Sequence, residues 1–106
     1  MGEIILPFVE GTIRLQTDDI VYVESYRHRI VFHTEDENYS IYKPLGEIEE
    51  LLSPSGFVRI HKSYIVNLRH VKSVNNYILT LDDGMNFIIP RGRYKKVKES
   101  LIKFNC

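Results

Sequence analysis

Cysteine is almost absent from this sequence, because the only one, Cys106, is the last of its 106 residues. An internal disulfide and a cysteine-based metal cluster are therefore excluded. No apolar run approaches the roughly 18 residues of a membrane span, and no apolar stretch near Met1 is typical of a secretory signal. We therefore expect a cytoplasmic protein that has no contact with a membrane.

Net charge is also absent, because 14 Lys and Arg residues balance 14 Asp and Glu residues. The two signs are nevertheless separated along the chain. Windows 26–33, 59–72 and 91–98 hold 11 of the 14 basic residues and no acidic residue. Any one window is most simply a solvated surface, but three of them together favour one strongly positive face and a polyanionic partner.

Recognisable catalytic, cofactor and metal motifs are missing as well. The four histidines form no HExxH or His-x-His pair, and Gly84 and Gly92 are isolated, so no phosphate-binding glycine loop is present. We expect neither an enzyme nor a bound cofactor. The sequence also lacks a pair of helices joined by a tight turn and the Cys and His ligands of a zinc finger, which excludes two common kinds of DNA-binding motif.

Short runs rich in β-branched and aromatic residues dominate what is present. They predict strands at 4–8, 12–15, 20–24, 29–33, 39–42, 57–59, 71–74, 77–81 and 86–89. Polar turn residues separate these runs at 10–11, 35–38 and 82–84. A chain of this length with 43% apolar residues can bury a core of its own, so we expect a single domain over residues 1–106.

Two segments have helical periodicity instead. After Pro44, which suits a first helical position, apolar residues at 45, 48, 51 and 52 predict a helix of about two turns. A terminal helix is indicated by Tyr94, Val97, Leu101 and Phe104 on one face, with basic residues opposite. The predicted fold is mainly β, an elongated antiparallel β-sheet domain with one short internal helix and a C-terminal helix.

Four segments in this order carry a family resemblance: DDIVYVES (18–25) with HRIVFH close behind, LGEIEELL (45–52), FVRIHKSYIVNLRHVKSV (57–74) and IIPRGRYKKVK (88–98). They cover nearly the whole chain. In them the sequence resembles the LytTR-type DNA-binding domains of bacterial response regulators. The resemblance implies transcription regulation by loops that insert into successive major grooves of duplex DNA. It also implies a receiver domain upstream in a longer protein, paired direct repeats as the target, and a dimer on DNA.

The resemblance also implies which residues contact bases, namely His28, Lys62 and Arg93. Lys62 departs from the Asn of some relatives, and a Lys directs a single cation at guanine where Asn would pair with adenine. The fork of Arg93 suits bidentate contact with guanine. Phosphate contacts are expected from the remaining polar side chains of the same segments: Arg27, Arg29, Arg59, His61, Ser63, Arg91, Lys95 and Lys96.

Several of these residues have a structural interpretation as well. Alternation in VRIHKS places Arg59 and His61 opposite the apolar residues, and His61 could either organise the loop or contact DNA. Asn67 is interpreted as a turn-forming residue and Glu24 as a partner of Arg27 or His28. Four tyrosines are most simply strand and core residues: Tyr26, Tyr39, Tyr42 and Tyr77.

Two other functions use the same residues. A β-rich module for RNA or another polyanion would present the same basic loops, although no paired aromatic segment for base stacking is present. A protein interaction domain would instead place a partner on the apolar residues Ile65 and Val66. Salt separates these hypotheses, because DNA binding weakens steeply with salt and apolar docking does not.

Overall fold

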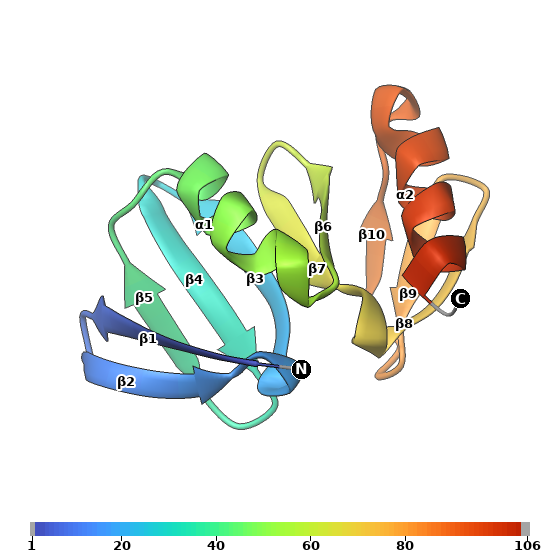
Figure 1. Ribbon diagram of the computed structural model, residues 1–106. Helices are drawn as coiled ribbons and strands as arrows, with labels where there is room; N and C mark the ends of the chain where they lie inside the picture. Colours follow the sequence, from blue (N-terminus) through green and yellow to red (C-terminus); the bar gives the residue numbers. More distant parts are fainter. Residues whose placement is uncertain (1, 105–106) are drawn as a thin grey trace.

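The computed structural model describes residues 2–104, so Met1 and Cys106, on which two of the expectations above rest, lie outside the described residues. Residues 2–104 form short strands, two α-helices and three 3₁₀ turns, and Figure 1 shows their arrangement. The elements are β1 (Glu3–Phe8), β2 (Gly11–Gln16), η1 (Thr17–Asp19), β3 (Ile20–Tyr26), β4 (Arg29–Thr34), β5 (Asn38–Ile41), α1 (Leu45–Leu52), η2 (Ser53–Ser55), β6 (Phe57–His61), β7 (Tyr64–Asn67), η3 (Leu68–His70), β8 (Val71–Asn75), β9 (Ile78–Leu81), β10 (Asn86–Ile88) and α2 (Arg91–Phe104).

The strands form three antiparallel sheets. β1 pairs with β2, the order β5-β4-β3-β7-β6 makes a five-stranded sheet, and β10-β9-β8 makes a three-stranded sheet. The molecule measures 39 × 29 × 24 Å along its principal axes. The predicted elongated antiparallel fold with one internal and one C-terminal helix is confirmed. Neither helix in the described part of the chain is long and apolar enough to cross a membrane.

One strand, β7, was missed from the sequence. The sequence pattern predicts no strand between residues 59 and 71, but residues 64–67 pair with β3 on one side and with β6 on the other. Only Lys62 and Ser63 separate β6 from β7, and neither is a strong turn residue. A two-residue turn without Gly or Asn leaves little signal in a sequence, so only the first strand of this hairpin could be predicted.

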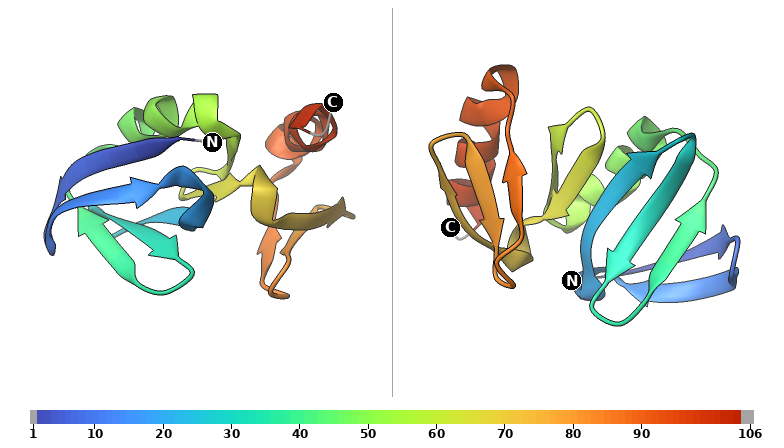
Figure 2. Two further views of the ribbon diagram at one scale, coloured as in Figure 1. Left: turned by 60° about the horizontal axis from the view of Figure 1, so that its bottom comes forward. Right: turned by 180° about the vertical axis from the view of Figure 1, so that it is seen from behind.

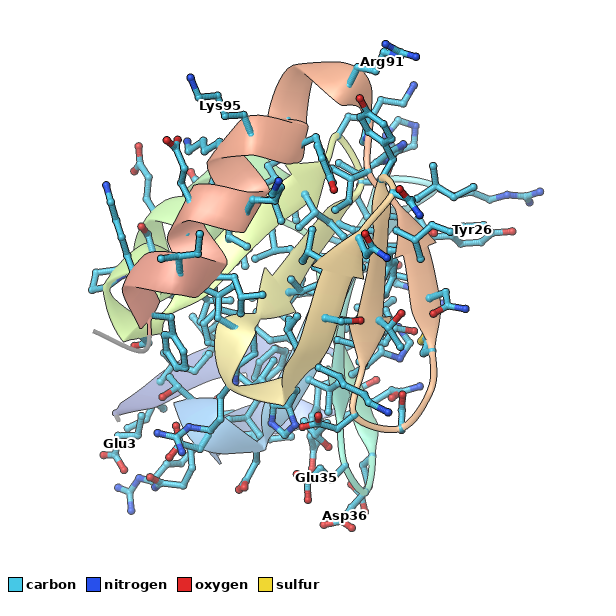
Figure 3. The ribbon with its side chains drawn as sticks, turned by 90° about the vertical axis from the view of Figure 1, so that its right-hand side faces the viewer. Glu3, Tyr26, Glu35, Asp36, Arg91 and Lys95 are labelled. Carbon is cyan, nitrogen blue, oxygen red and sulfur yellow. The ribbon has the colours of Figure 1, made fainter. Side chains whose placement is uncertain are left out.

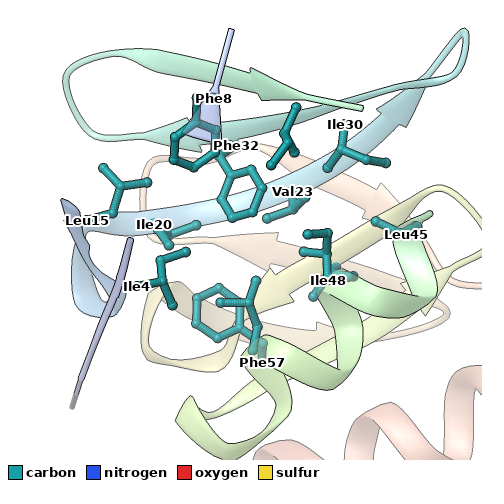
Figure 4. Packing of buried hydrophobic residues seen from close by; sticks show 13 residues of the cluster. Ile4, Phe8, Leu15, Ile20, Val23, Ile30, Phe32, Leu45, Ile48 and Phe57 are labelled. Carbon is teal, nitrogen blue, oxygen red and sulfur yellow. The ribbon is translucent and has the colours of Figure 1, made fainter. Parts of the chain in front are cut away.

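The buried side chains form two separate cores. The first core lies between the β1–β2 hairpin, the five-stranded sheet and α1, and Figure 4 shows Phe32 and Val23 at its centre. The second core lies between the β6–β7 hairpin, the three-stranded sheet and α2, and it contains Leu79 and Val97, both fully buried. Figure 1 shows the two halves side by side, with β6 and β7 between them.

The β6–β7 hairpin contributes to both cores because its side chains alternate. Phe57 and Ile65 pack into the first core, whereas Val58, Ile60 and Val66 pack into the second. The apolar residues on either side of Lys62 therefore anchor the hairpin in both cores.

Each helix covers one core. In α1, Leu45, Ile48 and Leu52 are buried, while Leu51 is 41% exposed and lies off the buried stripe that the periodicity predicted. Figure 2 shows α2 in the other half of the molecule, where Val97 is its fully buried residue. Gly56, at a φ of 84°, allows Phe104 at the end of α2 to approach the backbone that leads into β6, because a Cβ there would lie 2.6 Å from the ring of Phe104.

Asn67 joins the end of β7 to the start of β3. Its side-chain amide donates to the carbonyls of Thr17 and Ile20, at 3.2 and 2.9 Å, and its carbonyl oxygen accepts from the amide of Arg69. The side chain is 1% exposed, so water cannot replace these bonds. The interpretation of Asn67 as a turn-forming residue is confirmed.

Replacing Asn67 by Ala should therefore lower the free energy of unfolding by roughly 2 to 4 kcal/mol, because two buried carbonyls and one amide lose their partner. Urea denaturation followed by circular dichroism measures the change. Asn75→Ala, at an exposed position on β8, is the matched control and should change stability by less than about 0.5 kcal/mol. Equal losses in the two variants would contradict the role given to Asn67.

Candidate nucleic-acid interface

The three residues predicted to contact bases lie on three segments at one end of the molecule. His28 is in the β3–β4 turn, Lys62 is in the β6–β7 turn, and Arg93 is in the first turn of α2. These segments form a row along the upper edge in Figure 1, and Figure 2 shows the same row from behind. We call this row the basic end.

Strand direction explains why two of the turns meet there. β3 runs toward the basic end, and both of its neighbours, β4 and β7, are antiparallel to it. The turns that lead into β4 and β7 must therefore lie beside the end of β3. A backbone hydrogen bond of 2.9 Å from the amide of Ser25 to the carbonyl of Ser63 links the two turns.

The β3–β4 turn presents its side chains at an unusual backbone geometry. Its two residues, Arg27 and His28, have positive φ values of 49° and 67°, as a type I′ turn requires. Arg rarely adopts this conformation, which favours Gly and Asn. Both side chains are exposed, and the guanidinium of Arg27 lies 5.3 Å from the ring centroid of Tyr26. The turn therefore holds two basic side chains where a smaller residue would be easier to accommodate.

Arg59 organises the β6–β7 turn. Its guanidinium donates to the carbonyls of His61 and Lys62, at 3.3 and 2.7 Å, and pairs with the carboxylate of Glu49 on α1 at 3.2 Å. The Arg59 side chain is only 21% exposed. All of these partners belong to the protein, so the geometry supports a positioning role for Arg59, and its expected phosphate contact stays a prediction.

His61 has a similar position inside the turn. Its Nδ1 accepts a hydrogen bond of 3.1 Å from the amide of Ser63, and its ring packs against that of Tyr64. Of the two roles left open for His61, this structure supports the organising one. Lys62 lies at the tip and is exposed. The turn is thus built by Arg59 and His61 and presents Lys62.

The start of α2 concentrates positive charge where helices normally avoid it. Arg91, Lys95 and Lys96 are exposed, Arg93 is half-buried, and the first turn contains no acidic residue. Cations near a helix N-terminus are repelled by the helix dipole, and anions are favoured there. Arg91 also lies 5.4 Å from the ring centroid of Tyr77. The arrangement lowers helix stability and suits an external anion.

Charge is divided between the two ends of the molecule. Figure 3 shows Arg91 and Lys95 at one end and Glu3, Glu35 and Asp36 at the other. Not every basic window lies wholly at the basic end, however. β4 and β7 both run away from that end, so the last residues of the first two windows lie at a distance from it. These later residues meet acidic partners: Arg69 pairs with Asp18 at 3.1 Å, His33 with Glu24 at 2.6 Å, and His70 lies 3.9 Å from the carboxylate of Glu35.

Two interpretations of single residues are wrong. Glu24 bonds His33 and not Arg27 or His28. Because Glu24 pairs with Val31 and Tyr22 pairs with His33, the side chain of His33 is the diagonal neighbour of Glu24 on the same face of the sheet. Tyr26, Tyr42 and Tyr77 are not core residues, since they are 55%, 66% and 38% exposed. Tyr26 is the last residue of β3, Tyr42 follows β5 and Tyr77 lies between β8 and β9, so all three lie where the strand pattern ends. Tyr39 does pack against the first core.

A hollow of about 600 Å³ lies away from the basic end. It lies between the two larger sheets and is lined by Tyr22, His33, Glu35, Asp82 and Asp83 among others. Burial and the nearby carboxylate of Glu24 raise the pKa of Tyr22 to about 12. Within residues 2–104, no three His, Cys, Asp or Glu side chains are grouped so as to hold a metal ion.

Comparison with protein families defines the class of this domain. The model of the LytTr DNA-binding domain matches residues 10–102, a span that includes every residue predicted to contact DNA. The chain belongs to this family. The LytTr DNA-binding domain of a response regulator from Bacillus cereus has the same fold, with a TM-score of 0.76 over 96% of this chain and 97% of that one, at 23% identity.

The similar full-length proteins are regulators. The chain is 30% identical over 92 residues to the transcriptional regulatory protein LytR of Staphylococcus aureus, covering 82% of this chain and 37% of the relative. It is 29% identical over 97 residues to the sensory transduction protein LytT of Bacillus subtilis, covering 87% of this chain and 40% of the relative. The chain thus spans less than half the length of these curated relatives.

The link between Glu49 and Arg59 yields a test of how the β6–β7 turn is held. Glu49→Gln keeps the shape of the side chain but removes its charge, which should cost about 1 kcal/mol in this hydrogen bond. The Ser63 amide should then exchange with solvent about fivefold faster by NMR hydrogen exchange. Glu50→Gln, at an exposed neighbouring position on α1, should leave this rate unchanged. If both variants accelerate exchange alike, α1 does not hold the turn.

Proposed function

We propose that residues 1–106 form one domain that binds duplex DNA in a sequence-specific manner and thereby regulates transcription. The observation that carries this proposal is the basic end: three turns with exposed cations, no acidic residue within any of the three, and a scaffold that holds them in place. Membership of a family of DNA-binding domains supports it. Phosphate attraction supplies most of the affinity of such a surface, and the side chains at its tips supply selectivity.

The row of turns suggests how the domain meets the duplex. The longest extent of the molecule is 39 Å, close to the roughly 34 to 36 Å of one turn of B-DNA. The β3–β4 turn and the start of α2, at the two sides of the row, could then enter major grooves one turn apart, with the β6–β7 turn between them. Such a mode needs no recognition helix along the groove.

The base contacts follow from the side chains presented. Arg93 would contact guanine through both arms of its fork, and Lys62 would direct one cation at guanine O6 or N7. His28 would donate or accept one hydrogen bond according to its tautomer. Ser63 and His61 would contact phosphates at the β6–β7 turn. The other phosphate contacts are assigned to the cations around the three base-contacting residues: Arg27, Arg29, Arg59, Arg91, Lys95 and Lys96.

The wider context extends the proposal beyond this chain. In a longer response regulator, a receiver domain would precede the domain and control how it engages DNA. Two copies would occupy paired direct repeats and contact each other there as a dimer. The work would take place in the cytoplasm, where bacterial DNA lies.

Two other functions make different demands on the surface. An RNA module stacks bases on aromatic side chains displayed by a sheet. Here Tyr22, Phe32, Tyr64 and Phe87 pack inside the molecule or against one another instead. An apolar docking site at Ile65 and Val66 has no support, because both side chains are fully buried. Selection of bound duplexes from a random pool tests DNA binding and yields the target in one experiment.

Arg93→Ala tests the strongest base contact. We expect binding to the selected duplex to weaken by roughly 1 to 3 kcal/mol and the preference at one base pair to relax, because the bidentate contact is lost. Fluorescence anisotropy with the selected duplex and its single-base variants measures both effects. Arg93→Lys should keep part of the affinity and lose the preference. Wild-type selectivity in Arg93→Ala would remove this residue from base recognition.

Lys95→Gln tests a phosphate contact and should behave differently. All duplexes should be bound more weakly by a similar factor, and the slope of log K against log salt should fall by about 0.9, the contribution of one phosphate. Lys72→Gln, an exposed Lys on β8 away from the basic end, is the matched control and should leave the slope unchanged. An unaltered slope for Lys95→Gln would show that this side chain meets no phosphate.

A further inference from the structure

A shallow groove lies beside His28 at the outer side of the basic end. It separates the β3–β4 turn from residues 42–44, which connect β5 to α1, and has a volume of about 410 Å³. Its lining consists of Ser25, His28, Ile30, Tyr42, Lys43, Pro44 and Leu45. Figure 2 shows the start of α1 next to the β3–β4 turn, so the row of segments at the basic end extends beyond the three that carry the predicted base contacts.

The connecting segment is fixed at both ends but presents its middle to solvent. Ile41 and Leu45, on either side of it, are 4% and 7% exposed. Between them, Tyr42 is 66% exposed and the side chain of Lys43 is 41% exposed. A large aromatic ring in such an exposed position adds little to folding, because its apolar surface stays in water. The segment therefore holds two side chains in place without using them for its own packing.

The charge of Lys43 is available to a ligand. Its ammonium lies 3.9 Å from the carboxylate of Glu47, one turn along α1, and the Glu47 side chain is 60% exposed. An exposed pair at this spacing contributes little to stability. A phosphate could therefore displace Glu47 at small cost.

The groove presents donors that suit the phosphates of a DNA backbone. The imidazole, phenol and ammonium groups of His28, Tyr42 and Lys43 line it and can donate to phosphate oxygens, whereas Ile30 and Leu45 are 2% and 7% exposed and belong to the first core. No side chain caps the first amides of α1, and the one acidic residue of its first turn, Glu47, is exposed. The groove is also continuous with the turn that carries His28.

We propose that Tyr42 and Lys43 form a fourth DNA contact, to the backbone phosphates just outside the base pair that His28 reads. This inference rests on the proposed function and extends it, because the DNA footprint then reaches beyond the three turns on the α1 side only.

The test combines protein variants with shortened DNA. Lys43→Gln and Tyr42→Phe are compared with wild type on the duplex selected from the random pool, and on the same duplex shortened one base pair at a time from each end. On the long duplex, Lys43→Gln should lower the salt slope by about 0.9, and each variant should bind roughly threefold to tenfold more weakly. On a duplex shortened at one particular end, wild type should weaken to the level of the variants, and the substitutions should have no further effect.

The controls separate this inference from the proposed function. Lys72→Gln should match wild type on every duplex, and thermal unfolding should show all variants folded. If wild type selects a duplex but Lys43→Gln and Tyr42→Phe bind it as wild type does, the fourth contact is wrong and the proposed function stands. Equal losses on long and shortened duplexes would also overturn it, because the substitutions would then act through His28. If wild type selects no duplex, both proposals fail.

Discussion

The pairing of β3 with both β4 and β7 is the constraint on which the rest of the molecule depends. Ile20 and Val23 on this strand are fully buried, so its register cannot slip without moving the first core into water. Because β3 lies in the middle of the five-stranded sheet, its direction decides where two separate turns emerge. The bond between Ser25 and Ser63 and the three hydrogen bonds of Asn67 fix the two ends of the same pairing.

Much of the fold could be predicted because its elements carry strong local signals. β-branched runs identified every strand except β7, and helical spacing identified both helices. The predicted strands and α1 lie within two residues of their observed bounds. β7 could not be predicted because Lys62 and Ser63 are not the residues that typically form a two-residue turn. The resemblance in four ordered segments gave the family, which residue chemistry alone could not have given.

The candidate site was only partly accessible from sequence. That His28, Lys62 and Arg93 lie at one end is a property of strand pairing, which no short window of sequence reports. Basic windows were a useful guide, but they could not show that Arg59 faces inward to carbonyl groups of its own turn. Neither could they show that His33 and Arg69, which lie in the same windows, pair with acidic residues away from the basic end. Charge along a sequence indicates a surface only where the chain stays on that surface.

The shared β6–β7 hairpin has a consequence for how target sites can diverge within such a fold. Because the hairpin packs into both cores, Lys62 is fixed relative to the whole molecule, whereas the β3–β4 turn depends on the first core and the start of α2 on the second. The β3–β4 turn is tied to this hairpin by the bond between Ser25 and Ser63, whereas no such bond within residues 2–104 holds the start of α2. Repacking the second core would therefore change the spacing between Lys62 and Arg93 and leave the spacing between Lys62 and His28 in place, so one of the two spacings is free to change during evolution and the other is fixed.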